Sequence, residues 1–201
     1  MDKGFIPALI AAAVSGALVV IGWFVLNALS RRREIAAQRD IAARVYLENQ
    51  IEQLYGPLLG LIQYSRMAFS VAAKKLPTDV SGRIDFSRFS ALHSEIWHFF
   101  IESYFLPVNS EIRQLIRSKM HLLESGILPK SFEDFFRHEV QFEALHRLWK
   151  EKGVESPEIS GPGWPNDFES DVKTVLDRLR LRHEFFLQRL GASGHKGEAV
   201  D

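Results

Sequence analysis

The longest apolar run of the chain lies near its N-terminus. From Phe5 to Leu29 the sequence contains no charged residue across 25 positions. As an α-helix this run would be roughly 37 Å long, which exceeds the roughly 30 Å hydrocarbon core of a bilayer. A cleaved signal peptide has an apolar region of only about 7–15 residues. The pattern therefore predicts an uncleaved transmembrane helix at residues 5–29.

Basic residues follow the apolar run at once. Arg31, Arg32 and Arg33 come directly after it, whereas residues 1–4 carry one positive and one negative charge. The positive-inside rule then predicts a single-pass protein of the inner membrane, with residues 1–4 outside and the C-terminal part in the cytoplasm. The three arginines are also suited to contact anionic lipid headgroups.

Small residues recur at every fourth position within the apolar run, at Ala8, Ala12 and Gly16. Small side chains on one ridge allow two membrane helices to approach closely. The pattern is consistent with a helix-pairing face. The alternative is that alanine is simply common in such segments and the ridge faces lipid.

Beyond the apolar run, hydrophobic positions recur at helical spacing. Ile51, Leu54, Leu58, Leu61 and Ile62 show this spacing, and sustained alternation of apolar and polar residues is missing. We therefore expect an all-α fold, in which the transmembrane helix continues into a cytoplasmic bundle of about five helices. The expected parts are a juxtamembrane stalk helix at 30–75, kinked at Gly56-Pro57 and packed with the bundle; a bundle at 76–190 with helices at 86–105, 110–125, 131–152 and 167–190; and a flexible tail at 191–201.

Local signals set the expected boundaries of the second helix. Asp85 is a suitable N-cap for a helix that begins at Phe86. Leu106-Pro107 should end that helix, because a residue before proline disfavours the α conformation. Its apolar stripe, and thus its buried face, would comprise Phe89, Leu92, Ile96, Phe99 and Phe100.

Composition excludes several classes of function. The chain has no cysteine, so disulfides and thiolate metal sites are impossible. Its 25 basic and 25 acidic residues balance, which argues against a general nucleic-acid binder. We find no nucleophile elbow, phosphate-binding loop or dinucleotide-binding pattern. No cofactor is predicted.

Two Glu-x-x-His pairs, Glu95/His98 and Glu143/His146, have the spacing of carboxylate-bridged metal sites in helical bundles. Helical geometry argues against a shared site. At about 100° per residue, Glu95 and His98 point roughly 120° and 180° away from the apolar stripe of their helix. Glu143 lies roughly 90° from the apolar face that His146 shares. Helix surface or boundary positions are the favoured interpretation, and a metal centre is the alternative.

Four stretches together resemble a loose class of uncharacterised bacterial proteins. They are IEQLYGPLLGLI (51–62), PVNSEIRQLIRSKMHLL (107–123), SFEDFFRHEVQFEALH (131–146) and WPNDFESDV (164–172). In that class one membrane helix precedes a small helical cytoplasmic domain. The resemblance spans most of residues 45–180 and implies a fold and a location, without an activity or site residues.

The leading hypothesis for function is a membrane-anchored interaction protein that acts as an adaptor or sensor. Its expected partners are the lipid bilayer and either another protein or a second copy of the chain, but not nucleic acid. Aromatic residues are enriched at interfaces, although core packing is the more common fate of each. The candidate contact residues are Tyr55, Tyr64, Trp97, Tyr104, Trp149 and Trp164. One alternative is an effector or immunity component of a bacterial conflict system that oligomerises in the membrane. The other is a carboxylate-histidine metal enzyme.

Overall fold

The computed structural model describes the backbone of residues 5–153 and 163–194, and the side chains of residues 16, 20–153 and 163–188. Within these ranges the protein is all-helical, which confirms the predicted fold class. The only extended pairing among the described residues is a β-bridge between Thr78 and Ile84. The chain divides into two compact units, residues 1–45 and 46–201.

The first unit consists of the N-terminal part of helix α1 (Phe5–Gln50). Arg31, Arg32 and Arg33 are exposed on this helix. No helix in the described part of the chain is both long and apolar enough to cross a membrane. Residues 1–4 and the side chains of Ala8 and Ala12 lie outside the described residues; at Gly16 an added Cβ would meet nothing within 4 Å.

The expected interruption at Gly56-Pro57 takes the form of a widened turn rather than a break. A five-residue π-helical turn, Ile51–Tyr55, joins α1 to α2 (Gly56–Ala73). Proline cannot donate a hydrogen bond, and its ring clashes with the carbonyl four residues earlier in a regular α-helix. The wider turn relieves this clash, because the Gly56 N–H donates to the Ile51 carbonyl five residues back.

The predicted helix end at Leu106-Pro107 is wrong, because a second π-helical turn accommodates the proline there. Helix α3 (Ala91–Phe100) passes through a π-helical turn, Ile101–Phe105, into α4 (Leu106–Ser118). Leu106 is helical, with φ −62° and ψ −46°, and its N–H donates to the Ile101 carbonyl. The described residues therefore form four continuous helical segments instead of the expected five.

The start of α3 also differs from the prediction. Asp85 caps only a short 3₁₀ turn, Phe86–Arg88, by accepting a hydrogen bond from the Ser87 N–H at 3.1 Å. The α-helix begins at Ala91, where Ser90 and His93 form a reciprocal capping box. A second 3₁₀ turn, Met120–Leu122, follows α4.

The last two helices lie close to their predicted positions. Helix α5 (Lys130–Lys152) ends at Gly153, whose φ of +64° is the left-handed conformation that glycine adopts without strain. Helix α6 (Phe168–Gly194) extends four residues beyond its expected end, into the predicted tail. The remainder of that tail, 195–201, lies outside the described residues.

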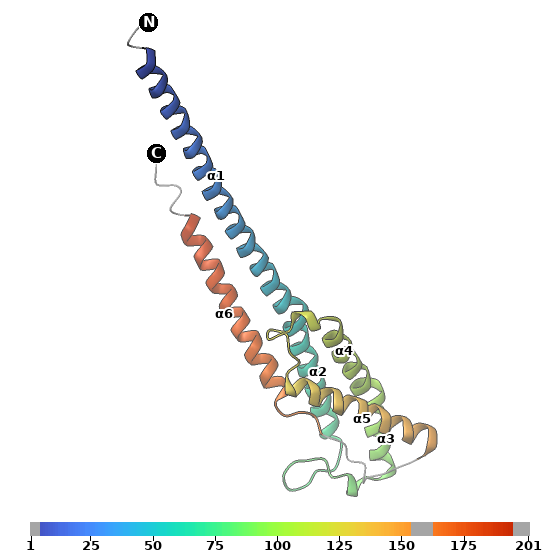
Figure 1. Ribbon diagram of the computed structural model, residues 1–201. Coiled ribbons are helices and arrows are strands. Elements are labelled where there is room, and N and C mark those ends of the chain that lie inside the picture. The colour runs from blue at the N-terminus through green and yellow to red at the C-terminus, as the bar shows by residue number, and fades with distance from the viewer. Residues whose placement is uncertain (1–4, 154–162, 195–201) are drawn as a thin grey trace. The chain divides into compact units, whose positions relative to one another are not determined.

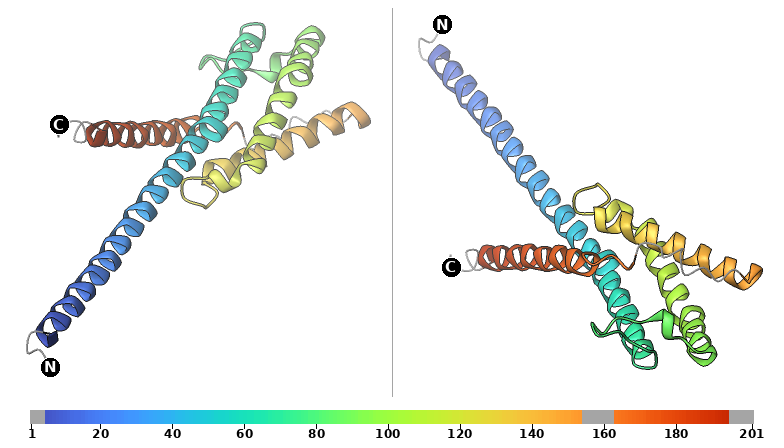
Figure 2. Two further views of the ribbon diagram at one scale, coloured as in Figure 1. Left: turned by 90° about the horizontal axis from the view of Figure 1, so that it is seen from above. Right: turned by 90° about the horizontal axis from the view of Figure 1, so that it is seen from below.

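Within the second unit, α2 is the central helix (Figures 1 and 2). It packs against α3, α4 and α6, and α5 packs against α4 and α6. The main core joins residues of α2, α4, α5 and α6, including Leu58, Ile112, Phe135 and Leu176, which are almost completely buried. A second cluster lies between α2 and the turn at Ile101–Phe105.

The buried face of α3 is not the predicted stripe. Leu92 and Phe99 are 62% and 58% exposed, whereas Ile101 and Phe105 are buried. The partly buried Trp97 packs on the same inner cluster. The predicted helix contained Ile101 and Phe105, but it was treated as a regular α-helix, and the π-helical turn Ile101–Phe105 changes the register of the side chains.

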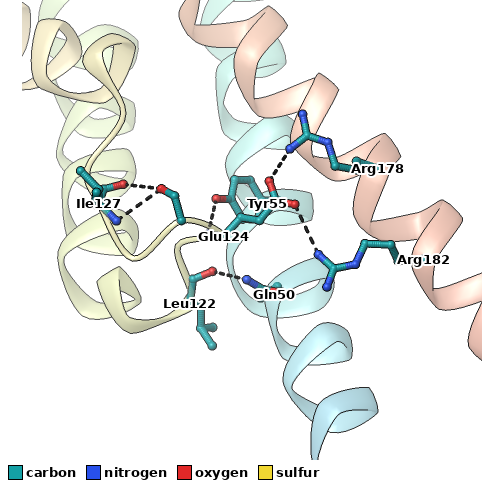
Figure 3. Close-up of polar contacts among 8 residues, drawn as sticks. Gln50, Tyr55, Leu122, Glu124, Ile127, Arg178 and Arg182 are labelled. Atoms are coloured by element: carbon teal, nitrogen blue, oxygen red, sulfur yellow. Dashed lines mark hydrogen bonds and ion pairs between the residues drawn. The ribbon is translucent and has the colours of Figure 1, made fainter. Parts of the chain in front are cut away.

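A polar cluster connects the loop after α4 to the turn at Ile51–Tyr55 and to α6 (Figure 3). The Glu124 N–H donates to the Tyr55 hydroxyl at 3.1 Å, and the Glu124 carboxylate accepts from Arg178 at 2.7 Å and Arg182 at 3.4 Å. Gln50 donates to the Leu122 carbonyl at 2.9 Å. Burial raises the pKa of the Tyr55 hydroxyl, although the Glu124 N–H opposes the shift.

Candidate functional site

A cavity of about 550 Å³ lies within the second unit, where α2, α4 and α5 meet the segment that precedes α6. Its volume is typical of sites that bind small molecules, which usually measure about 300–1,000 Å³. The lining residues are Ser65, Arg66, Phe69, Phe86, Trp97, Phe105, Asn109, His138, Phe142, Gly163, Trp164, Asn166 and Glu169.

Helical spacing brings these side chains to a common space. Residues four apart lie on the same face of a helix, and three such pairs face the cavity: Ser65 and Phe69, Phe105 and Asn109, and His138 and Phe142. In the second pair, Phe105 ends the π-helical turn and Asn109 lies in the α-helix that follows it.

Aromatic rings form most of the cavity wall. The ring of Trp97 lies 5.5 Å from Phe86, 5.5 Å from Phe105 and 6.5 Å from Phe69, measured between centroids. On another side, the His138 ring stacks on Phe142 at 5.5 Å and meets the edge of Trp164 at 5.6 Å. Such distances and angles are those of favourable aromatic contacts, and they give the wall a defined shape.

Few polar groups reach this apolar space. Asn109 is 3% exposed, and its side-chain carbonyl oxygen accepts no hydrogen bond from any described residue. Ser65 is also buried. At the rim, Arg66 and Glu169 form an ion pair of 3.0 Å, so their charges compensate each other.

The arrangement suits binding of a small molecule. A mostly apolar pocket with one or two fixed polar groups is the usual form of such a site. The buried oxygen of Asn109 gives such a pocket a point of orientation.

Glu143 and His146, two residues of the alternative metal centre, make other contacts. Glu143 binds Arg113 at 3.3 Å and Arg147 at 2.9 Å, and His146 lies 3.2 Å from the Glu102 carboxylate. Among the described residues, no group of three or more His, Asp or Glu side chains is arranged to hold a metal ion.

Of the other two residues, Glu95 lies where it was expected and His98 does not. Glu95 is exposed, as predicted, but His98 is partly buried. Its ring stacks on Trp149 of α5, with centroids 3.4 Å apart, and lies 6.2 Å from the ring of His146. The prediction that His98 faces away from the protein interior followed from the misassigned stripe and is wrong.

Glu139 is a buried acid that the sequence analysis did not single out. It is 3% exposed, and Arg113 of α4 binds one of its oxygens at 2.7 Å. Burial raises the pKa of this carboxyl group despite the nearby arginine. Glu139 follows His138 directly, so this ion pair joins α4 to α5 close to one wall of the cavity.

Comparison of this chain with family models, curated proteins and solved structures finds no match. The resemblance to bacterial single-pass proteins, and the helix-pairing face at Ala8, Ala12 and Gly16, therefore remain predictions.

Two of the cavity residues, Trp97 and Trp164, are among the aromatic residues that the sequence indicated as candidate contacts for a protein partner. Asn109 is not among them, because the sequence placed it between two expected helices. Once α4 is known to begin at Leu106, Val108, Asn109, Ile112 and Ile116 fall on one buried face. A polar residue on an otherwise apolar helix face was the signal that could have identified Asn109 as a functional candidate.

Proposed function

We propose that this protein is a membrane-anchored sensor, whose helical unit binds a small apolar molecule in the aromatic cavity. The uncharged segment 5–29 is the anchor, and Arg31, Arg32 and Arg33 keep the helical unit on the cytoplasmic side. The observation that supports binding is the cavity itself: about 550 Å³, walled by aromatic rings and containing a buried amide oxygen.

The absence of cysteine makes a direct test of binding possible. In a Ser65→Cys variant the full chain has one thiol, which lines the cavity. We expect saturating 2-naphthol to slow alkylation of this thiol by N-ethylmaleimide at least fivefold in detergent solution, because a bound ligand would cover it. The labelled fraction is measured by mass spectrometry over time.

Ser118→Cys provides the matched control. Ser118 is exposed at the end of α4 and does not line the cavity, so 2-naphthol should leave its alkylation rate unchanged. An unchanged rate at position 65, or equal slowing at both positions, would contradict the proposed binding function.

Membrane anchoring is tested separately. We expect the chain to remain in the membrane pellet after carbonate extraction, and a C-terminal topology reporter to be active in the cytoplasm. Release of the chain by carbonate, or a reporter active outside, would contradict this part of the proposal.

A further inference from the structure

We infer that the ligand of this cavity is a neutral aromatic molecule that donates one hydrogen bond to the side-chain oxygen of Asn109. The inference rests on the proposed binding function and specifies its ligand class. Three features of the cavity support it: its ring-lined wall, its buried Asn109 oxygen without a hydrogen-bond partner among the described residues, and the ion pair at its rim.

The wall favours an aromatic ligand. Phe69, Phe86, Trp97 and Phe105 form one continuous group of rings, with neighbouring centroids 5.5–6.5 Å apart. A flat ring system can stack on some of these faces and meet the edges of others, which gives it more contact than a branched aliphatic molecule of equal size.

Asn109 favours a hydrogen-bond donor. A buried polar atom without a partner is costly, and the large majority of such atoms in folded proteins are paired. Val108 and Ile112, next to Asn109 on the inner face of α4, are apolar and buried, so they cannot supply a side-chain partner. A donor on the ligand would satisfy this oxygen, and a ligand without one would leave it unpaired.

Charge favours a neutral ligand. Arg66 and Glu169 line the rim and neutralise each other across 3.0 Å. A charged group entering the aromatic interior would lose its hydration, and this ion pair is already compensated.

Three probes of similar size test the inference in the Ser65→Cys protein. They are 2-naphthol, which has a hydroxyl donor, 2-methoxynaphthalene, which has none, and 2-naphthoate, which is anionic. We expect the concentration for half-protection to be about tenfold lower for 2-naphthol than for either of the others, which is the usual effect of one satisfied buried polar group.

An Asn109→Leu substitution in the same protein then tests the residue. Leucine is of similar size and apolar, so the buried face of α4 is retained, and the ratio between 2-methoxynaphthalene and 2-naphthol should fall from about ten to about one. The change in this ratio between the two proteins does not depend on how each probe partitions into detergent, because the partition of each probe is the same for both proteins.

Each possible failure has a distinct meaning. If 2-naphthol and 2-methoxynaphthalene protect the thiol equally well with Asn109 present, the inferred donor is wrong while cavity binding stands. Equal protection by 2-naphthoate would refute a neutral ligand, and an unchanged ratio in Asn109→Leu would refute the role of this residue. If no probe protects, the proposed function fails together with the inference.

Discussion

Gly56→Ala is expected to destabilise the protein, although alanine normally favours a helix. A Cβ at position 56 would lie 2.7 Å from the Ile51 carbonyl oxygen, which is a backbone atom held in the π-helical turn. Overpacking of this kind costs about 1–3 kcal/mol, and the upper part of that range applies because backbone cannot rotate away. The better helix propensity of alanine offsets about 1 kcal/mol. The free energy of unfolding should therefore fall by about 1–2 kcal/mol.

Gly60→Ala is the matched control on the same helix. Gly60 is exposed, and a Cβ there would meet nothing within 4 Å, so this substitution should raise the free energy of unfolding by up to about 1 kcal/mol. Both variants are compared with wild type by urea titration of the full chain, monitored by circular dichroism. Opposite shifts of the denaturation midpoint are expected. If Gly56→Ala stabilises as much as Gly60→Ala, the close approach in the turn is not real.

Two further substitutions test polar contacts in the second unit. Tyr55→Phe leaves the Glu124 N–H without its acceptor and should lower the free energy of unfolding by about 1–2 kcal/mol in the same urea titrations. Tyr64→Phe is the control, because Tyr64 is 46% exposed and its substitution should change this free energy by less than about 0.5 kcal/mol. Equal effects of the two substitutions would argue against the Tyr55 contact. Glu139 has a raised pKa in the folded protein, so its contribution to stability is complete below the ordinary carboxyl value of 4.5 and declines as pH rises through the folded value. The stability of Glu139→Gln relative to wild type should therefore increase between about pH 4.5 and neutrality, and a constant difference across that range would show that burial does not raise this pKa.

The helical character of the fold could be predicted because it depends on periodicity, which each segment displays by itself. Helix α5 is the clearest case, since Gly153 marks its end. The two proline sites could not be predicted in the same way. Rules for proline describe a regular α-helix, and at Pro57 and Pro107 the helix changes its own geometry to accommodate the residue.

The cavity was less accessible to sequence reasoning, because its wall comes from segments far apart in the chain. Phe69, Trp97 and Phe142 each look like ordinary core residues, and only packing shows that their rings enclose a space. Glu139 is a similar case. It lies on a helix rich in charged residues, and nothing local distinguishes it from the exposed acids around it.

The two π-helical turns share the pattern Ile-Glu-x-x-aromatic-x-Pro, at 51–57 and 101–107. A π-helical turn is equivalent to one residue inserted into an α-helix, and one residue corresponds to about 100° of rotation about the helix axis. Removing one residue from either turn would therefore rotate the side chains that follow it in the same continuous helix by about 100° about the helix axis. Phe69 after the first turn, and Asn109 after the second, would then point elsewhere, so the shape of the cavity depends on two single-residue insertions.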